Sequence, residues 1–157
     1  MFKMWRGIMS TKYLNSTLID KVIEILPKLT RGSKCYVSKR MSQNPALTME
    51  MVLAYPEFNW KCDNLSSKNM NINDILDHPE LKWNWNIVSD NLSVTMDIVL
   101  SNIDKPWNWK YLSRHPNITM SDIESHMDLR WDWGSHGVSN NPNLTMTMIE
   151  SHPDKNW

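Results

Sequence analysis

Apolar residues recur along the chain in pairs three positions apart, and each pair follows a threonine. Counted from that threonine, they stand at the first and the fourth position. The pairs are Met49 and Val52, Met96 and Val99, Met120 and Ile123, and Met146 and Ile149. Residues three apart lie on one side of an α-helix, whereas a half-buried strand alternates with period two. The pattern therefore predicts a series of short amphipathic helices.

The threonines before these pairs are suited to begin the helices, because an N-cap threonine accepts a hydrogen bond from a free backbone N–H of the first turn. The caps are Thr48, Thr95, Thr119 and Thr145. Asp122, three residues after Thr119, approximates a capping box. The segment before each cap reads Ser-x-Asn-Pro or a variant of it. Because the residue before a proline disfavours the helical region, we expect a turn there.

A Trp-x-Trp motif follows at a regular interval. It begins at Trp83, Trp107 and Trp131, and both steps are 24 residues (107 − 83 and 131 − 107). A fixed step of this length is typical of stacked repeats. We place the motif in a second helix that starts near Pro106 in the best-preserved repeat. A strand would put both Trp on one face, and the threonine caps argue against a β-solenoid.

On a helix, residues i and i+2 point about 200° apart, so the two Trp of a motif cannot share one face. We therefore expect one Trp to pack on its own repeat and the other on the neighbouring repeat. The predicted repeat core comprises Trp83, Trp85, Trp107, Trp109, Trp131 and Trp133. The middle residues form a polar ladder that faces either a partner or solvent, and we expect them to add little stability. They are Asn59, Asn84, Asn108 and Asp132; Trp157 is a further candidate for contact with a partner.

The fold class predicted from these patterns is all-α, a right-handed α-solenoid of about five helix-pair repeats of roughly 24 residues. We expect a single repeat domain over residues 1–157, with an atypical N-terminal cap over 1–33 and tandem repeats over 34–157, the last one incomplete. The segment Leu18 to Pro27 resembles Leu47 to Pro56 and is interpreted as a degenerate first repeat whose helix ends or bends at Pro27. Thr30 to Ser33 is expected to be a loop.

Charge is distributed unevenly although the net charge of the chain is zero. Residues 1–40 hold nine Lys and Arg against two acidic residues (9 − 2 = +7), and residues 41–157 hold eight against fifteen (8 − 15 = −7). This asymmetry favours either a polyanion-binding end or end-to-end pairing into a homo-oligomer. Nucleic acid is the weaker alternative for the Trp-rich part, because its negative charge repels phosphate. Two cysteines without ligand spacing, no signal-like start and no long apolar run predict an intracellular, reducing compartment and no membrane partner.

Candidate chemistry is outweighed by structural interpretations. His78, His126 and His152 hold equivalent repeat positions, about 10 Å apart in a stack and too distant to share one metal, so we expect them to end helices. His115 stands where other repeats have asparagine and is expected to be a turn residue. A serine recurs once per repeat, at Ser42, Ser66, Ser89, Ser113 and Ser139. A nucleophile is not needed five times over, so these serines are expected to form structural hydrogen bonds. We predict no enzyme activity, no catalytic residues, no metal and no cofactor.

The combination S-x-N-P-x-L-T-M-x-x-I with W-x-W resembles short tandem repeats in uncharacterised proteins of giant nucleocytoplasmic DNA viruses, of the mimivirus and marseillevirus kind. Residues 42–157 carry the resemblance, and the run from Ser139 to Glu150 is among its closest parts. It implies a viral repeat protein located in the host cytoplasm or the virion, and it implies no catalytic residues. We expect a non-catalytic module that binds or scaffolds a host or viral protein. The alternatives are nucleic-acid binding through the basic N-terminal end and a hydrolase with an unrecognised site.

Overall fold

The structure, a computed structural model, describes residues 16–56, 58–66 and 70–157. Over these residues it is all-helical and contains no strand, which confirms the predicted fold class at that level. The chain forms two compact units, unit 1 over Met1–Trp83 and unit 2 over Asn84–Trp157. Of the atypical cap predicted over residues 1–33, residues 1–15 lie outside the described part.

The described helices of unit 1 differ in length. They are α2 (Ser16–Ile25), the 3₁₀ helix η1 (Leu26–Lys28), α3 (Arg31–Ser42), α4 (Met49–Ala54), α5 (Cys62–Leu65) and α6 (Ile72–Asp77). The proline at position 27 stands in η1, directly after α2, so the prediction that this helix ends at Pro27 is confirmed. The loop predicted from Thr30 to Ser33 is wrong. Thr30 instead caps α3, and its hydroxyl accepts the backbone N–H of Ser33 at 3.4 Å.

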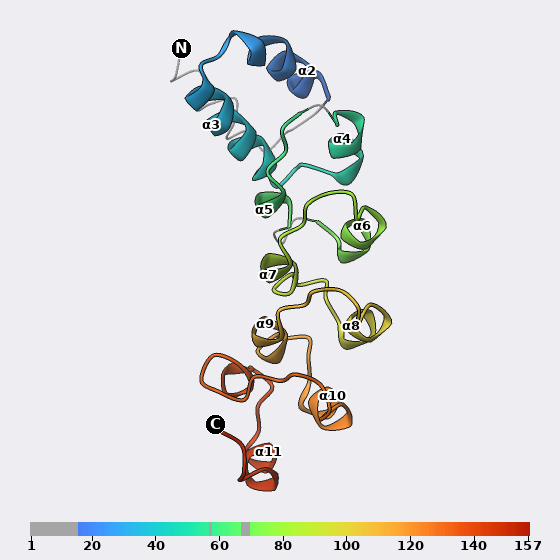
Figure 1. Ribbon diagram of the computed structural model, residues 1–157, viewed down its shortest axis with the longest axis vertical. Helices are drawn as coiled ribbons and strands as arrows, with labels where there is room; N and C mark the ends of the chain where they lie inside the picture. Colours follow the sequence, from blue (N-terminus) through green and yellow to red (C-terminus); the bar gives the residue numbers. More distant parts are fainter. Residues whose placement is uncertain (1–15, 57, 67–69) are drawn as a thin grey trace. The chain divides into compact units, whose positions relative to one another are not determined.

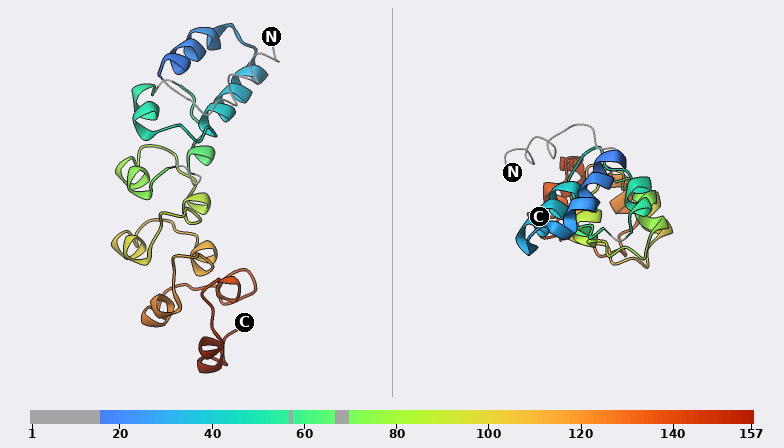
Figure 2. Two further views of the ribbon diagram at one scale, coloured as in Figure 1. Left: turned by 180° about the vertical axis from the view of Figure 1, so that it is seen from behind. Right: turned by 90° about the horizontal axis from the view of Figure 1, so that it is seen from above.

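Unit 2 alternates helices of two kinds. They are α7 (Trp85–Val88), α8 (Met96–Ser101), α9 (Trp109–Ser113), α10 (Met120–Ser125), the 3₁₀ helix η2 (Val138–Asn140) and α11 (Met146–Ser151). Two opposite views show α7 and α9 in one row and α8 and α10 in another (Figures 1 and 2). We call the six-residue helices α4, α6, α8, α10 and α11 the first helices of the repeats, and α5, α7 and α9 the second helices.

The predicted caps begin the first helices. The hydroxyls of Thr48, Thr119 and Thr145 each accept the backbone N–H three residues later. Thr119 and Asp122 form the full capping box, because the Asp122 carboxylate also accepts the Thr119 backbone N–H at 2.7 Å. Thr95 holds the cap position without a side-chain bond, and Asn71 caps the repeat in which threonine is missing.

Within each unit, the core takes one apolar residue from each of several equivalent positions of the repeat. The first helices bury the expected residues, such as Val52, Ile75, Val99 and Ile123, each at most 2 % exposed. Two further buried positions are the residue before the cap and one residue of the second helix. Their members are Leu47, Val94 and Ile118, and Leu65, Val88, Leu112 and Val138. A six-residue helix is marginal alone in water, so these buried residues supply the tertiary packing that such helices need.

After α10, where a second helix would be expected, the chain instead forms a tight turn from Gly134 to Gly137, and η2 follows this turn. The Gly137 N–H donates to the Gly134 carbonyl at 2.8 Å, and the Val138 N–H donates to the Asp132 carbonyl at 2.6 Å. A Cβ added at Gly137 would overlap with that Asp132 carbonyl, which is backbone and has no side-chain freedom to move away. The close approach of the two backbone segments therefore requires glycine at position 137.

We expect Gly137→Ala to lower the free energy of unfolding by about 1–3 kcal/mol, as forced overpacking does. Gly32→Ala is the matched control, because a Cβ at Gly32 meets nothing within 4 Å and alanine favours the α3 helix by about 0.5–1 kcal/mol. Urea denaturation of both variants measures the two changes. An unchanged midpoint for Gly137→Ala would show that the turn does not hold this geometry.

Candidate functional site

The Trp-x-Trp motif lies at the junction between repeats. The second Trp begins the second helix, as Trp85 begins α7 and Trp109 begins α9, while the first Trp precedes the helix. The prediction that both Trp belong to one helix starting near Pro106 is therefore wrong. The middle residue, such as Asn108, has extended backbone dihedral angles (φ −88°, ψ 99°), and this separates the two rings.

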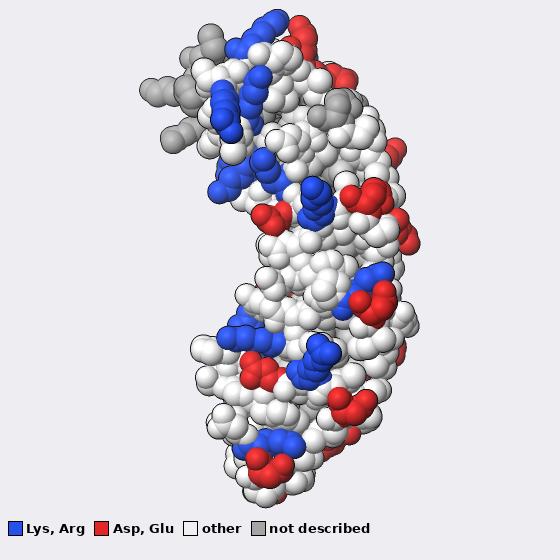
Figure 3. All heavy atoms as spheres, viewed as in Figure 1, with Lys and Arg blue, Asp and Glu red and all other residues white. Residues whose placement is uncertain are grey.

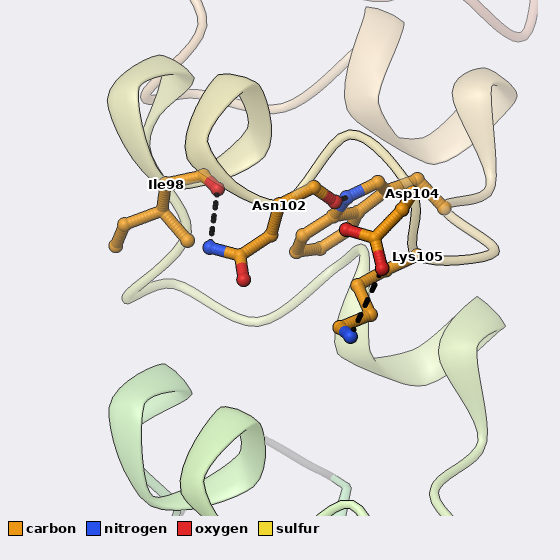
Figure 4. A network of polar contacts seen from close by, with 5 residues as sticks. Ile98, Asn102, Asp104 and Lys105 are labelled. Carbon is orange, nitrogen blue, oxygen red and sulfur yellow. Dashed lines mark hydrogen bonds and ion pairs between the residues drawn. The ribbon is translucent and has the colours of Figure 1, made fainter.

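The first Trp of each motif packs on its own repeat. Its indole N–H donates to the carbonyl of the C-cap residue that directly follows the first helix, five positions earlier. The bonds are Trp60 to Tyr55 (3.0 Å), Trp83 to His78 (2.7 Å), Trp107 to Asn102 (2.8 Å), Trp131 to His126 (2.8 Å) and Trp157 to His152 (2.9 Å). Figure 4 shows the end of α8 at Asn102, where the side-chain amide of Asn102 also donates to the Ile98 carbonyl at 3.0 Å. Trp83, Trp107 and Trp131 are 9 % exposed or less.

The second Trp of each motif contacts the next repeat. Trp85 meets Trp107 edge to face with ring centroids 5.0 Å apart, and the corresponding distances are 5.3 Å for Trp109 with Trp131 and for Trp133 with Trp157. The expectation that one Trp packs on its own repeat and the other on its neighbour is thus confirmed in unit 2. The rings of Trp85, Trp109, Trp133 and Trp157 remain half-buried.

The middle residues of the motif are tied into the fold. The Asn108 side-chain oxygen accepts the backbone N–H groups of Lys110 and Tyr111, and its NH₂ group donates to the Asn86 side chain at 2.6 Å. Asn84 caps α7, and Asp132 accepts the Gly134 N–H. The sequence pattern did not indicate that Asn84 and Asn108 cap helices, while the expectation that these residues add little stability stays a prediction. Their half-buried side chains leave part of each group at the surface.

In unit 1 the middle position belongs to Lys61 and not to Asn59. Lys61 follows the buried Trp60 and precedes α5, whose N-cap it is, whereas Asn59 stands before Trp60. The assignment of Asn59 to the ladder was therefore wrong by two positions. The sequence offered a signal in the step from Trp60 to Trp83, which is 23 residues (83 − 60).

The recurring serines connect successive repeats. The Ser89 hydroxyl donates to the Trp85 carbonyl at 2.7 Å and accepts the backbone N–H of Asn108 at 2.8 Å. Ser113 makes the same two bonds with Trp109 and Asp132, and Ser42 makes them with Ser38 and Lys61. The hydroxyl hydrogen and a lone pair are both used, so the structural role predicted for these three serines is confirmed.

The histidines at the ends of first helices hydrogen-bond the helix itself. His126 Nδ1 lies 2.9 Å from the Asp122 carbonyl and His152 Nδ1 lies 3.2 Å from the Met148 carbonyl. A carbonyl only accepts, so each Nδ1 carries the proton. His78 Nδ1 instead lies 3.0 Å from the Glu80 carboxylate. Across residues 16–56, 58–66 and 70–157, no group of three potential ligands could hold a metal ion.

Two surface carboxylates follow first helices in the same way. Glu80 has a lowered pKa, first because of a backbone hydrogen bond from its own residue and second because His78 donates to it. The pKa of Asp154 is lowered chiefly by the hydrogen bond from Lys155. A lowered pKa means that folding favours the ionised carboxylate, so this stabilisation is lost as the pH falls. Both carboxylates are at the surface.

The turn between repeats is held by one buried polar residue. Asn141 accepts the Asn143 N–H at 2.8 Å and donates to the carbonyls of Ser113, His115 and Ile118 in the preceding repeat. His115, 1 % exposed, replaces asparagine in its own repeat. Its Nδ1 accepts the Asn117 N–H at 3.1 Å, so Nε2 donates to the Asn91 carbonyl at 3.0 Å. The prediction that His115 is a turn residue is confirmed.

Both cysteines are free thiols; Cys35 is exposed and Cys62 is half-buried. None of the helices in the described part of the chain has the length and hydrophobicity to cross a bilayer. The chain matches no known protein family, no curated protein sequence and no solved structure.

We expect His115→Asn to change the free energy of unfolding by less than about 1 kcal/mol, because asparagine forms the equivalent bonds in other repeats. His115→Ala should lower it by about 2–5 kcal/mol, since it leaves the Asn117 N–H and the Asn91 carbonyl without this partner in a buried turn. Denaturant midpoints measure both changes. Equal losses for the two variants would assign the role of His115 to the volume of its ring.

Asn108→Ala should lower the free energy of unfolding by about 1 kcal/mol, the usual effect of removing an N-cap. Asn108→Asp keeps a side-chain oxygen that can accept the backbone N–H groups of Lys110 and Tyr111, and should lose less. Thermal and urea unfolding of the pair test this expectation. A loss for Asn108→Ala within about 0.5 kcal/mol, the range of plain surface changes, would mean that the cap contributes nothing measurable.

Proposed function

We propose that the chain is a non-catalytic repeat protein that binds and scaffolds another protein through its surface. The observation that carries this proposal is the use of the recurring polar groups inside the fold. The hydroxyl of Ser89, the amide of Asn141 and the imidazole of His115 each bond a neighbouring repeat. Side chains that hold the backbone in place are poorly suited to act as nucleophile, acid or base, because those roles need groups that are free to meet a substrate.

The finer architecture that we propose is a right-handed α-solenoid of about five helix-pair repeats with a degenerate N-terminal repeat. Two observations support it. The first helices begin at Met49, Ile72, Met96, Met120 and Met146, at steps of 23, 24, 24 and 26 residues. Within unit 2, each Trp-x-Trp motif also contacts the following repeat through its second ring. Repeat proteins built this way present an extended surface, which suits protein binding.

The resemblance of residues 42–157 to giant-virus repeats supports the further proposal that this is a viral protein acting in the host cytoplasm or the virion. Free thiols at Cys35 and Cys62 are compatible with a reducing compartment. A second candidate function is nucleic-acid binding through the basic end. It is favoured by the Lys and Arg side chains that gather where unit 1 carries α3 (Figures 1 and 3).

Affinity capture tests the proposal and separates these candidates. The full chain is immobilised and exposed to an extract of giant-virus-infected host cells, with and without nuclease, at about 0.1 and 0.5 M salt. We expect a host or viral protein to be retained after nuclease treatment. The heat-unfolded chain serves as the control for non-specific adsorption. Retention that disappears with nuclease, together with a steep salt dependence, would favour nucleic-acid binding instead. No protein retained above the control would overturn the proposal.

A further inference from the structure

Unit 1 departs from the repeat pattern at α3. Ser42 makes the same hydroxyl bonds as Ser89 and Ser113, so the end of α3 stands at a second-helix position. The second helices α5, α7 and α9 have four or five residues, whereas α3 has twelve. Its extra turns begin at Arg31 and extend beyond the part that the repeat requires. A local departure from an otherwise consistent pattern is where a functional site is expected.

The extra turns of α3 form one wall of a groove, which we call the α3 groove. It has a volume of about 660 Å³, in the range of sites that bind small molecules or short peptide segments. The facing wall is aliphatic and consists of Ile23, Leu26 and Pro27 from α2 and η1. The groove also includes Phe58 and Lys61 from the segment before α5.

The walls of the α3 groove are anchored by hydrogen bonds. The Lys61 N–H donates to the Ser42 hydroxyl at 2.9 Å, and Gln43 donates to the Asn64 side chain at 3.1 Å, so α3 is joined to α5 and the residue before it. On the other side, the Tyr55 hydroxyl donates to the Asp20 carboxylate at 2.7 Å and holds α2 to the end of α4. A groove with anchored walls loses little entropy when it binds a ligand.

Three cations line this groove: Arg31, Lys34 and Lys61. None of them forms an ion pair with a described residue, and no described carboxylate lines the groove. The two Lys–carboxylate ion pairs of the described residues join sequence neighbours in unit 2, Asp104 with Lys105 and Asp154 with Lys155. The α3 groove therefore combines an aliphatic wall with positive charges that can pair with an incoming anion.

We propose that the α3 groove binds an acidic peptide segment of the protein partner, with a leucine-like side chain against Ile23, Leu26 and Pro27 and carboxylates at Arg31, Lys34 and Lys61. The inference rests on the proposed protein-binding function and names its site. A peptide fits better than single-stranded nucleic acid because bases need an accessible aromatic face on which to stack. The aromatic residue of this groove, Phe58, is 5 % exposed and packs against Trp60 with centroids 4.3 Å apart.

Cys35 lines the groove and provides a reporter within it. The probe is a blocked ten-residue peptide in which Glu and Leu alternate, applied to the full chain carrying Cys62→Ser. We expect it to slow alkylation of Cys35 by about fivefold or more at saturation. Peptides with Gln for Glu, or with Ala for Leu, should protect much less. Fluorescence anisotropy of the labelled peptide with the unaltered chain gives the affinity independently of the Cys62 substitution.

Two triple variants separate the α3 groove from general basicity. Arg31→Gln with Lys34→Gln and Lys61→Gln removes the groove cations, and we expect peptide affinity to fall about tenfold or more. Lys28→Gln with Lys39→Gln and Arg40→Gln removes the same charge from residues that do not line the groove, and it should change affinity less than about threefold. Circular dichroism of both variants confirms that the helices are retained.

Three results would overturn this inference. They are equal losses in the two triple variants, no protection of Cys35 by the acidic peptide at millimolar concentration, and stronger protection by a single-stranded oligonucleotide of equal charge. The affinity capture described above is repeated with the groove variant. A protein partner that is retained equally by this variant would overturn the groove assignment while leaving the protein-binding function intact.

Discussion

The indole N–H of the first Trp in each motif donates to the carbonyl that ends the preceding six-residue helix, and the rest of the repeat depends on this bond. The last carbonyls of a helix need partners from outside the helix, and each of these carbonyls also accepts a backbone N–H three residues later, as Asn102 does from Lys105 at 3.1 Å. The five donor–acceptor distances, from the indole nitrogens of Trp60, Trp83, Trp107, Trp131 and Trp157 to their carbonyl oxygens, are 2.7 to 3.0 Å. A buried indole also needs an acceptor for its N–H. The bond therefore gives the buried indole its acceptor and places the ring at the end of its own first helix.

Side-chain hydrogen bonds to backbone groups also hold the junctions between repeats. The Ser113 hydroxyl accepts the Asp132 N–H of the next repeat, while Asn141 reaches back to three carbonyls of the preceding one. Backbone groups that a regular helix or sheet would pair internally are paired here by side chains of a neighbouring repeat. Serine, asparagine and tryptophan recur for this reason, and their recurrence is a structural requirement of very short helices.

Function is then expected where the repeat changes. In unit 1, α3 is longer than the other second helices, and the motif before α5 has Lys61 as its middle residue and Cys62 in place of the second Trp. The cations Arg31, Lys34 and Lys61 line an anchored groove there. The turn closed by Gly137 is a second departure, but its backbone segments are in close contact and leave no room even for a methyl group.

The sequence by itself determined the helical class, the regular step, the caps at Thr48, Thr119 and Thr145, and the turn role of His115. These features depend on neighbours within a few residues, so local patterns report them. Only the tertiary structure decided that Trp83 and Trp107 precede their second helices and that Asn108 caps one. A two-residue spacing cannot reveal a change from extended to helical backbone between the rings. The α3 groove was equally hidden, because it joins Ile23, Lys34 and Lys61, which no local pattern relates.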